Sequence, residues 1–372
     1  MSAKLSTVWV APQHTVAKIA MLRSYLFVWF SILGMRFVGR DLWYIDGFAG
    51  PGEYTNYSDG SPIAALKAAA QALAKTTRWQ AGSIHCVFIE EDKARFGNLQ
   101  QKLTNLPEHP RIQRHLHMGT FVDGLAQLRN EQTNPFTSDV PIFAFIDPFG
   151  PAGLSFNAVK DLLARPTCEV LINLDSDGIS RIYSAGENAN FRERLNEVFG
   201  DSGWGSELAG VQSQANAARK IVALYKRKLM ALPNVRYSFA FEMRSKNDTI
   251  DYHLVFASQH PTGLAKMKEV MKRIDQDGIY SFSDGHVNQQ TLFRYDDPAT
   301  HAQQMRTYFG SQTVAYGVIN DYALNESPFA NPKAMLKLLE INHQISVSSP
   351  RARRVGTFPD DAQHGMNIQF LG

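Results

Sequence analysis

Short apolar runs alternate with longer amphipathic segments through the first 175 residues of the chain. Runs of four to eight aliphatic and aromatic residues between polar or glycine-rich segments are typical of buried strands. They predict strands at 42–45, 84–89, 113–118, 141–146 and 169–174. Helices are predicted at 12–36, 63–75, 121–130 and 156–165, and a further helix is predicted to end near 106. Ser61 and Pro62 are the expected N-cap and first residue of the helix at 63–75. Continuous apolar strands that alternate with helices predict an α/β fold with helices on both faces of a parallel sheet.

The pattern changes after the fifth strand. Residues 188–232 are predicted to be helical around a Gly/Ser/Trp loop at 200–206. Two strands at 235–243 and 252–258 follow, joined by a turn at 246–248, and a helix is predicted at 264–274. A hairpin that closes five parallel strands predicts a Rossmann-like sheet with an antiparallel edge.

Composition changes again near residue 300, which predicts two domains, 1–295 and 300–372. Helices at 313–325 and 332–342 precede strands at 345–347 and 367–370, with a basic loop between the strands. That order is typical of a winged helix. Arg351, Arg353 and Arg354 in the loop are suited to phosphate contacts, although a solvated charged loop explains them equally well.

Composition narrows the class of protein only modestly. The 372 residues are 44% hydrophobic and 20% charged, as in ordinary globular proteins, and the net charge of +3 permits a nucleic-acid partner without requiring one. Cys86 and Cys168 each lie in an apolar run, which predicts two reduced core thiols. The apolar run at 25–33 is shorter than the roughly 20 residues needed to cross a bilayer, and no signal peptide is evident. We therefore expect a cytoplasmic protein without a membrane partner.

The strongest chemical signal is the loop that follows the first strand, Asp46-Gly47-Phe48-Ala49-Gly50-Pro51-Gly52. Ligands of open α/β sheets bind where strands end, and glycines let the backbone approach them. A dinucleotide fingerprint fails because Thr55 occupies the third glycine position, and a P-loop fails because the loop has no lysine. An acid followed by x-x-x-Gly-x-Gly is the pattern of S-adenosylmethionine enzymes. It predicts that this cofactor is held by Asp46, Gly47, Phe48, Ala49, Gly50 and Gly52, although a glycine turn without a ligand remains an alternative.

The next two strands supply further candidates for the cofactor. Glu90 ends the second strand, where a carboxylate can accept both ribose hydroxyls. Its distance from Asp46 along the chain exceeds the roughly 20 residues usual for such a pair, because a polar loop and a long helix intervene. Thr120 and Phe121, after the third strand, are expected to flank the adenine. Helix N-terminal charge is the alternative explanation for the acids around residue 90.

The fourth strand ends in Asp147-Pro148-Phe149-Gly150. Adenine-N6 and some cytosine methyltransferases carry a related tetrapeptide of Asp or Asn, two prolines and an aromatic residue, which holds an exocyclic amine and stacks on the base. Here the aromatic residue comes one position early and glycine replaces the last residue. We assign Asp147, Pro148 and Phe149 as candidate catalytic residues, with a plain Asp-Pro turn as the alternative.

Other polar residues follow the same edge of the predicted sheet. Asn173 and Arg181 come at and after the end of the fifth strand, and Tyr54 follows the glycine loop, so all three are candidates for substrate binding. His14 and Lys18 lie one turn apart on the first helix, where they could contact phosphate or substrate or face solvent. His253 and His260 flank a strand and are expected to be packing or capping residues. No spacing of His, Cys or acidic residues indicates a metal.

Taken together, these segments resemble the three-Cys-motif partner (TcmP) family. The resemblance rests on His14, Leu22, Tyr25, Leu26 and Trp29, on 44–54 with 60–62, on 145–150 and 171–173, and on 252–260 with Gly263 and Met267. It implies a methyltransferase-like domain, a C-terminal winged helix, and a partner protein similar to radical S-adenosylmethionine enzymes. The stretch 46–54 also resembles the large-subunit rRNA adenine-N6 methyltransferases.

These observations lead to one expected function and two alternatives. We expect a class I S-adenosylmethionine-dependent methyltransferase that acts on nucleic acid, with a base amine or similar group as acceptor. The first alternative is a methyltransferase of small molecules. The second is a non-catalytic protein that binds nucleic acid or a partner and keeps the cofactor fold.

Overall fold

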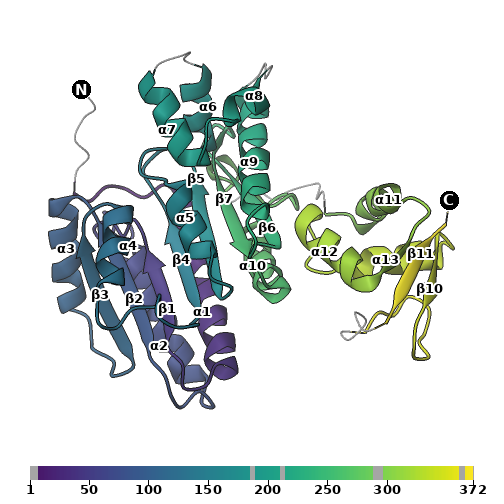
Figure 1. The fold of residues 1–372 in the computed structure, drawn as a ribbon, viewed down its shortest axis with the longest axis horizontal. Helices are drawn as coiled ribbons and strands as arrows, with labels where there is room; N and C mark the ends of the chain where they lie inside the picture. The colour runs from purple at the N-terminus through teal and green to yellow at the C-terminus, as the bar shows by residue number, and fades with distance from the viewer. Residues whose placement is uncertain (1–6, 185–188, 210–213, 288–295, 360–364, 372) are drawn as a thin grey trace.

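An eight-stranded sheet organises the larger part of the chain (Figure 1). The computed structural model describes residues 7–184, 189–209, 214–287, 296–359 and 365–371. The strand order is β3-β2-β1-β4-β5-β7-β6-β8; β1 to β5 run parallel, and β7 is antiparallel to both β5 and β6. The strands are β1 Leu42–Asp46, β2 Ile84–Glu90, β3 Ile112–Met118, β4 Ile142–Ile146, β5 Cys168–Leu174, β6 Tyr237–Arg244, β7 Ile250–Ser258 and β8 Ser281–Ser283.

Helices cover both faces of this sheet, as predicted. One buried cluster joins α1, α2, α3 and α10 to the sheet, and a second joins α4 to α9 to the opposite face. Because successive strand residues point to opposite faces, Tyr44 belongs to the first cluster while Trp43 and Ile45 belong to the second. The helices are α1 Gln13–Arg36, α2 Ser61–Lys75, α3 Lys93–Thr104, α4 Phe121–Arg129, α5 Phe156–Leu163, α6 Ser176–Ser184, α7 Ala189–Phe199, α8 Trp204–Leu208, α9 Gln214–Met230 and α10 Pro261–Ile274. Cys86 and Cys168 are buried and free, which confirms them as core thiols.

The structure corrects several details of the sequence analysis. Helix α6 was not predicted, because its Gly and Ser residues have low helix propensity, yet Ile179 is fully buried and holds it against the core. Helix α8 occupies part of the predicted loop at 200–206. Residues 188 and 210–213 of the expected helical region lie outside the described residues. Helix α2 begins at Ser61 itself, so the N-cap is Gly60 and the expected N-cap role of Ser61 was wrong.

Helix α1, Gln13–Arg36, confirms the helix predicted at 12–36 and extends well beyond the most apolar run at 25–33. It has 24 residues with a mean hydropathy of 1.5 over an 18-residue window, so its length and composition alone would suffice to span a membrane. Core helices pass the same test. Leu22, Leu26 and Phe30 of α1 are fully buried in the cluster on the sheet. The apolar face of α1 is therefore used in packing against the sheet and α2.

The C-terminal residues form a smaller module with a core of its own. A three-stranded antiparallel sheet, in the order β10-β11-β9, packs with three helices (Figure 1). The elements are α11 Pro298–Phe309, β9 Thr313–Ala315, α12 Tyr316–Glu326, α13 Lys333–Ile341, β10 Ile345–Ser348 and β11 Asn367–Phe370. Residues 313–315 were wrongly predicted as helix, and α11 was missed. The expected end of the first domain, residue 295, lies outside the described residues.

A buried lysine joins the module to the main sheet. Lys268 of α10 is fully buried, and its Nζ donates hydrogen bonds to the carbonyl oxygens of Ala323, Ser327 and Phe329, at 3.2, 2.5 and 3.2 Å. These carbonyls lie at and after the end of α12, where backbone oxygens lack partners within the helix. The Tyr280 hydroxyl donates to the Pro328 carbonyl, 2.8 Å away, beside them. The end of α12 is thus capped by a side chain of the other module.

We expect Lys268→Met to lower the free energy of unfolding by about 2–4 kcal/mol, because buried carbonyls would lose their donor. Urea unfolding at pH 7 measures this. Lys266→Met on the same helix is the control, since Lys266 is 37% exposed and paired with exposed Glu269; its effect should stay within about 0.5 kcal/mol. Equal effects of the two substitutions would contradict a capping role for Lys268.

Candidate functional site

A cavity of about 230 Å³ lies at the carboxyl ends of β1, β4 and β5. Its walls come from the glycine loop, from the Asp147–Gly150 tetrapeptide and from the residues that follow β5. Trp9, Lys18 and Tyr252 close it from the segment before α1, from α1 and from β7. The cavity therefore gathers five separate stretches of chain at the edge of the sheet where α/β proteins bind ligands.

The glycine loop leaves open space at Gly50. Gly50 and Gly52 have φ angles of +63° and +83°, in the left-handed region that favours glycine. A Cβ atom on Gly50 would meet nothing within 4 Å, whereas one on Gly52 would lie 2.9 Å from Leu99. Gly60 packs against the back of the loop, since a Cβ there would lie 2.6 Å from the Gly52 carbonyl carbon. Gly50 is thus the position at which a ligand can approach the loop backbone.

Asp46 lies beneath the loop and is fully buried. It accepts hydrogen bonds from the Tyr44 hydroxyl at 3.1 Å and from the Phe48 amide at 3.4 Å. Burial raises the pKa of Asp46 to about 7, although hydrogen bonds from Ser61, Tyr44 and Phe48 oppose the rise. The side chain of Asp46 does not line the cavity. In the structure its carboxylate supports the loop from the protein interior, through the hydrogen bond from the Phe48 amide.

Asp147 is held by two neighbours within the cavity. Both of its carboxylate oxygens accept from Lys18 Nζ, at 2.7 Å each, and Oδ1 also accepts from Asn173 Nδ2 at 2.6 Å. The Lys18 and Asp147 side chains are 6% and 18% exposed. The sequence singled out all three residues, but not their pairing, because 129 positions separate Lys18 from Asp147. The carboxylate expected to receive a substrate amine is therefore already bound by a cation.

Aromatic rings form another wall. The Trp9 ring meets Tyr54 and Phe149 edge-on, with centroids 5.5 and 5.2 Å away. Arg95 of α3 lies over Phe149, 4.8 Å from its centroid, and also over Trp9. Phe149 is 51% exposed, so part of its ring is available for stacking. Trp9 and Arg95 were missed, because nothing in the residues around them indicates a contact with this edge of the sheet.

The cavity is acidic. Four carboxylates line it, those of Glu53, Asp147, Asp175 and Asp251, against the cations of Lys18 and Arg181. Burial raises the pKa of Asp175, and the nearby charge of Asp251 adds to this rise. Among the described residues, no group of three or more His, Cys, Asp or Glu side chains could hold a metal ion. The charge of the cavity suits a cationic ligand.

Besides Asp46, four predicted cofactor residues do not line the cavity: Gly47, Glu90, Thr120 and Phe121. Glu90 is 5% exposed and accepts from the amides of Gly50 and Asp92, both at 2.8 Å. Thr120 is the N-cap of α4 and accepts from the Asp123 amide. Phe121 is buried against Gly47, where a Cβ would lie 2.7 Å from its ring. In the structure these residues make hydrogen bonds and packing contacts within the protein, and their contact with a cofactor stays a prediction.

Of the remaining predicted residues, some line the cavity and others belong to the C-terminal module. Pro148, Phe48, Ala49, Tyr54, Asn173 and Arg181 line the cavity. In the C-terminal module, Arg351 and Arg354 are exposed, whereas Arg353 pairs with Glu340 and lies over the Phe358 ring. The Arg353 guanidinium is thus bound within its own module, and its expected phosphate contact stays a prediction.

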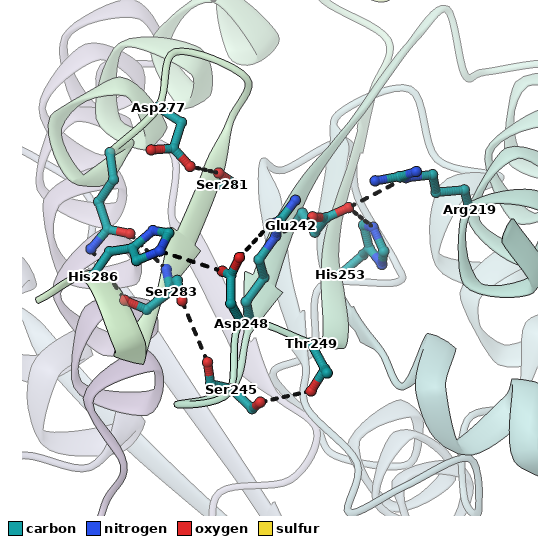
Figure 2. A network of polar contacts seen from close by, with 12 residues as sticks. Arg219, Glu242, Ser245, Asp248, Thr249, His253, Asp277, Ser281, Ser283 and His286 are labelled. Carbon is teal, nitrogen blue, oxygen red and sulfur yellow. Dashed lines mark hydrogen bonds and ion pairs between the residues drawn. The ribbon is translucent and has the colours of Figure 1, made fainter. Parts of the chain in front are cut away.

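A second polar network lies along β6, β7 and β8 (Figure 2). Glu242 faces Arg219 and His253, and burial of its carboxylate is outweighed by His253 and Arg244, which lower its pKa to about 2. His253 Nδ1 also lies 2.8 Å from the Ser176 hydroxyl. The arrangement resembles a Ser-His-acid triad, but Ser176 is fully buried and could not meet a substrate. The network ties α6 to the hairpin, which agrees with the packing role expected for His253; His260 caps α10, also as expected.

No protein-family model matches the chain, and no curated protein matches it either. Among solved structures it is similar to Trm1 from Pyrococcus horikoshii in complex with S-adenosyl-L-methionine, at 9% identity and a TM-score of 0.35, covering 73% of this chain and 61% of that one. It is similar to an O-methyltransferase from Bacillus cereus, at 15% identity and a TM-score of 0.32, covering 63% and 80%.

A third similarity is to a proposed methyltransferase from Porphyromonas gingivalis W83, at 14% identity and a TM-score of 0.28. That match covers 62% of this chain and spans 40% of the other protein. The strand order of the sheet, rather than these alignments, defines the fold as Rossmann-like, with an antiparallel β7 inserted beside β5.

The buried carboxyl of Asp46 leads to a prediction about pH. With a pKa raised from 3.8 to about 7, the folded state binds a proton that the unfolded state releases, so wild-type stability falls as pH rises from about 4 to about 7. The variant Asp46→Asn has no titrating carboxyl at this position, so its free energy of unfolding should not fall in this way. Between pH 5 and pH 8 the variant should gain about 2 kcal/mol relative to wild type, measured by urea unfolding. Parallel pH profiles for the two proteins would contradict the raised pKa.

Proposed function

We propose that this protein is an S-adenosylmethionine-dependent methyltransferase whose substrate is a nucleic acid. The observation that carries the proposal is the acidic cavity beside Gly50, at the carboxyl ends of β1 and β4 in a Rossmann-like sheet. The order 3-2-1-4-5-7-6 with β7 reversed is that of class I methyltransferases, which is why the sheet supports this cofactor over a dinucleotide. Methyltransferases among the structurally similar proteins are consistent with it.

The residues present fit such a cofactor on its methionine side. The open backbone at Gly50 and the excess of carboxylates suit a ligand with an amino-acid tail and a sulfonium charge. Bound S-adenosylmethionine would supply an electrophilic methyl group; the sulfur would keep the electron pair of the broken S–C bond, and the methylated acceptor would lose its proton to bulk solvent. The chain itself would bind and orient the partners and exclude water from the cavity. Phe149 and Tyr54 would pack on a planar acceptor group.

The C-terminal module is proposed to hold the polymer. Its element order and its exposed Arg351 and Arg354 support a winged-helix contact with phosphates. Membership of the TcmP family, a partner similar to radical S-adenosylmethionine proteins and a cytoplasmic location belong to the same proposal. A small-molecule acceptor is the second candidate, favoured by the acidic cavity, which would repel a phosphate placed inside it.

The cofactor site can be tested at Gly50 by calorimetry. We expect wild type to bind S-adenosylhomocysteine and Gly50→Ala to lose at least about tenfold in affinity, because the new Cβ would enter the open space above the loop. Gly39→Ala is the matched control, since Gly39 also has a positive φ, +81°, with nothing within 4 Å of its Cβ position. A wild-type protein without measurable binding would refute the cofactor assignment.

The polymer site can be tested by salt dependence. If Arg354 contacts a phosphate, Arg354→Gln should weaken binding to RNA or DNA and reduce the slope of log affinity against log salt by about 1. Arg129→Gln, at an exposed position of α4, should leave the slope unchanged. Arg353→Gln should instead lower the melting temperature, because it breaks the pair with Glu340. Wild-type methyl transfer to a small molecule, with no nucleic-acid binding, would favour the second candidate.

A further inference from the structure

Two buried polar atoms at the cavity lack partners. Asn173 Oδ1 and the Tyr252 hydroxyl make no hydrogen bond to any described residue, although Asn173 and Tyr252 are only 8% and 7% exposed. Both side chains line the cavity. Buried polar groups are nearly always hydrogen-bonded. These two belong to residues that line one cavity, where a ligand can supply the missing partners.

The Asn173 side-chain amide is oriented by the hydrogen bond of its Nδ2 atom. Its Nδ2 donates to Asp147 Oδ1 at 2.6 Å, which assigns the opposite atom of the amide, Oδ1, as the free acceptor. Asp147 is in turn held by Lys18, whose Nζ lies 2.7 Å from each carboxylate oxygen. Lys18 neutralises Asp147 and leaves Asn173 as the neutral acceptor of the group. A ligand donor therefore meets an amide oxygen here.

The Tyr252 hydroxyl supplies the second position. Tyr252 comes from β7, and its ring lies 5.1 Å from Lys18 Nζ and edge-on to His14. A hydroxyl oxygen can accept one hydrogen bond while donating another. Two acceptors on residues that line one cavity suit a group with two hydrogens, as a primary amine has and a hydroxyl has not. The aromatic wall of Trp9, Tyr54 and Phe149 suits a planar ring next to that amine.

We propose that Asn173 Oδ1 and Tyr252 bind the amino group of the substrate, a planar heteroaromatic ring with an exocyclic amine. Asp147 is then a positioning residue, which holds Asn173 through Nδ2 and is itself held by Lys18. This inference rests on the proposed function and deepens it, since it names the acceptor as nitrogen and moves the amine contact from Asp147 to Asn173.

Sinefungin provides a test that needs no substrate. In this analogue of the cofactor a carbon replaces the sulfur, and an amino group on that carbon replaces the transferred methyl, whereas S-adenosylhomocysteine keeps the sulfur and has no group at the methyl position. By calorimetry, wild type should bind sinefungin about tenfold more tightly than S-adenosylhomocysteine. Asn173→Ala should bring the two affinities within about threefold of each other by weakening sinefungin alone. Tyr252→Phe, which removes one oxygen, should reduce the preference in part. Asn234→Ala, at an exposed site bonded to the Ala164 carbonyl, should retain it in full.

The outcomes separate the two proposals. A preference for sinefungin that survives in both Asn173→Ala and Tyr252→Phe would overturn the amine site while leaving the cofactor site intact. Wild-type protein that binds the two ligands equally would overturn it as well. If neither ligand binds wild type, the proposed function fails, and the amine site fails with it. Tyr252→Phe keeps the test decisive if Asn173→Ala does not fold.

Discussion

The ion pair between Lys18 and Asp147 sets the geometry of the cavity. A carboxylate at the end of a buried strand is costly without a partner, and removing one member of such a pair typically costs about 3–5 kcal/mol. Lys18 belongs to α1, a helix that precedes β1 in the chain and packs on one face of the sheet. From there its Nζ reaches Asp147 after the end of β4. The pair thus fixes where α1 lies relative to the end of β4. Trp9, which precedes α1, and Asn173, which donates to Asp147, take their places from it.

Other carboxylates at the strand ends serve the backbone. Asp46 accepts from Tyr44 and Phe48 below the glycine loop, and Glu90 accepts the Gly50 amide from the side. The bonds from the Phe48 and Gly50 amides fix a loop that would otherwise rely on glycines, which lose more conformational freedom on folding than any other residue. The acids that sequence motifs assign to a ligand are here bound to groups of their own chain.

The sequence predicted the parallel strands well, because β1, β2, β4 and β5 are largely apolar runs separated by amphipathic helices. The exception is β3, which carries Gln113, Arg114 and two histidines. The sequence also predicted Tyr54, Phe149, Asn173 and Arg181 at one edge, because parallel strands end on the same side. It failed where a contact joins distant segments. Nothing near Trp9 points to Phe149, 140 positions away, and nothing near Lys268 points to the end of α12. Local propensity failed too: the Gly- and Ser-rich α6 is helical because Ile179 is buried, and 313–315 form a strand because β11 pairs with them.

The distribution of charge has a consequence for a polymeric substrate. The cavity carries more carboxylates than cations, which attracts a cationic cofactor and repels phosphates. A nucleic-acid substrate would then place only a base in the cavity. A cationic surface elsewhere would hold its phosphate backbone away from the carboxylates. The chain has such residues in Arg351 and Arg354, and the module that carries them is fixed to α10 by Lys268 rather than by a chain connection alone. In the proposed function, placing the two charges on two modules would require a firm junction between them, and Lys268 provides buried hydrogen bonds at that junction.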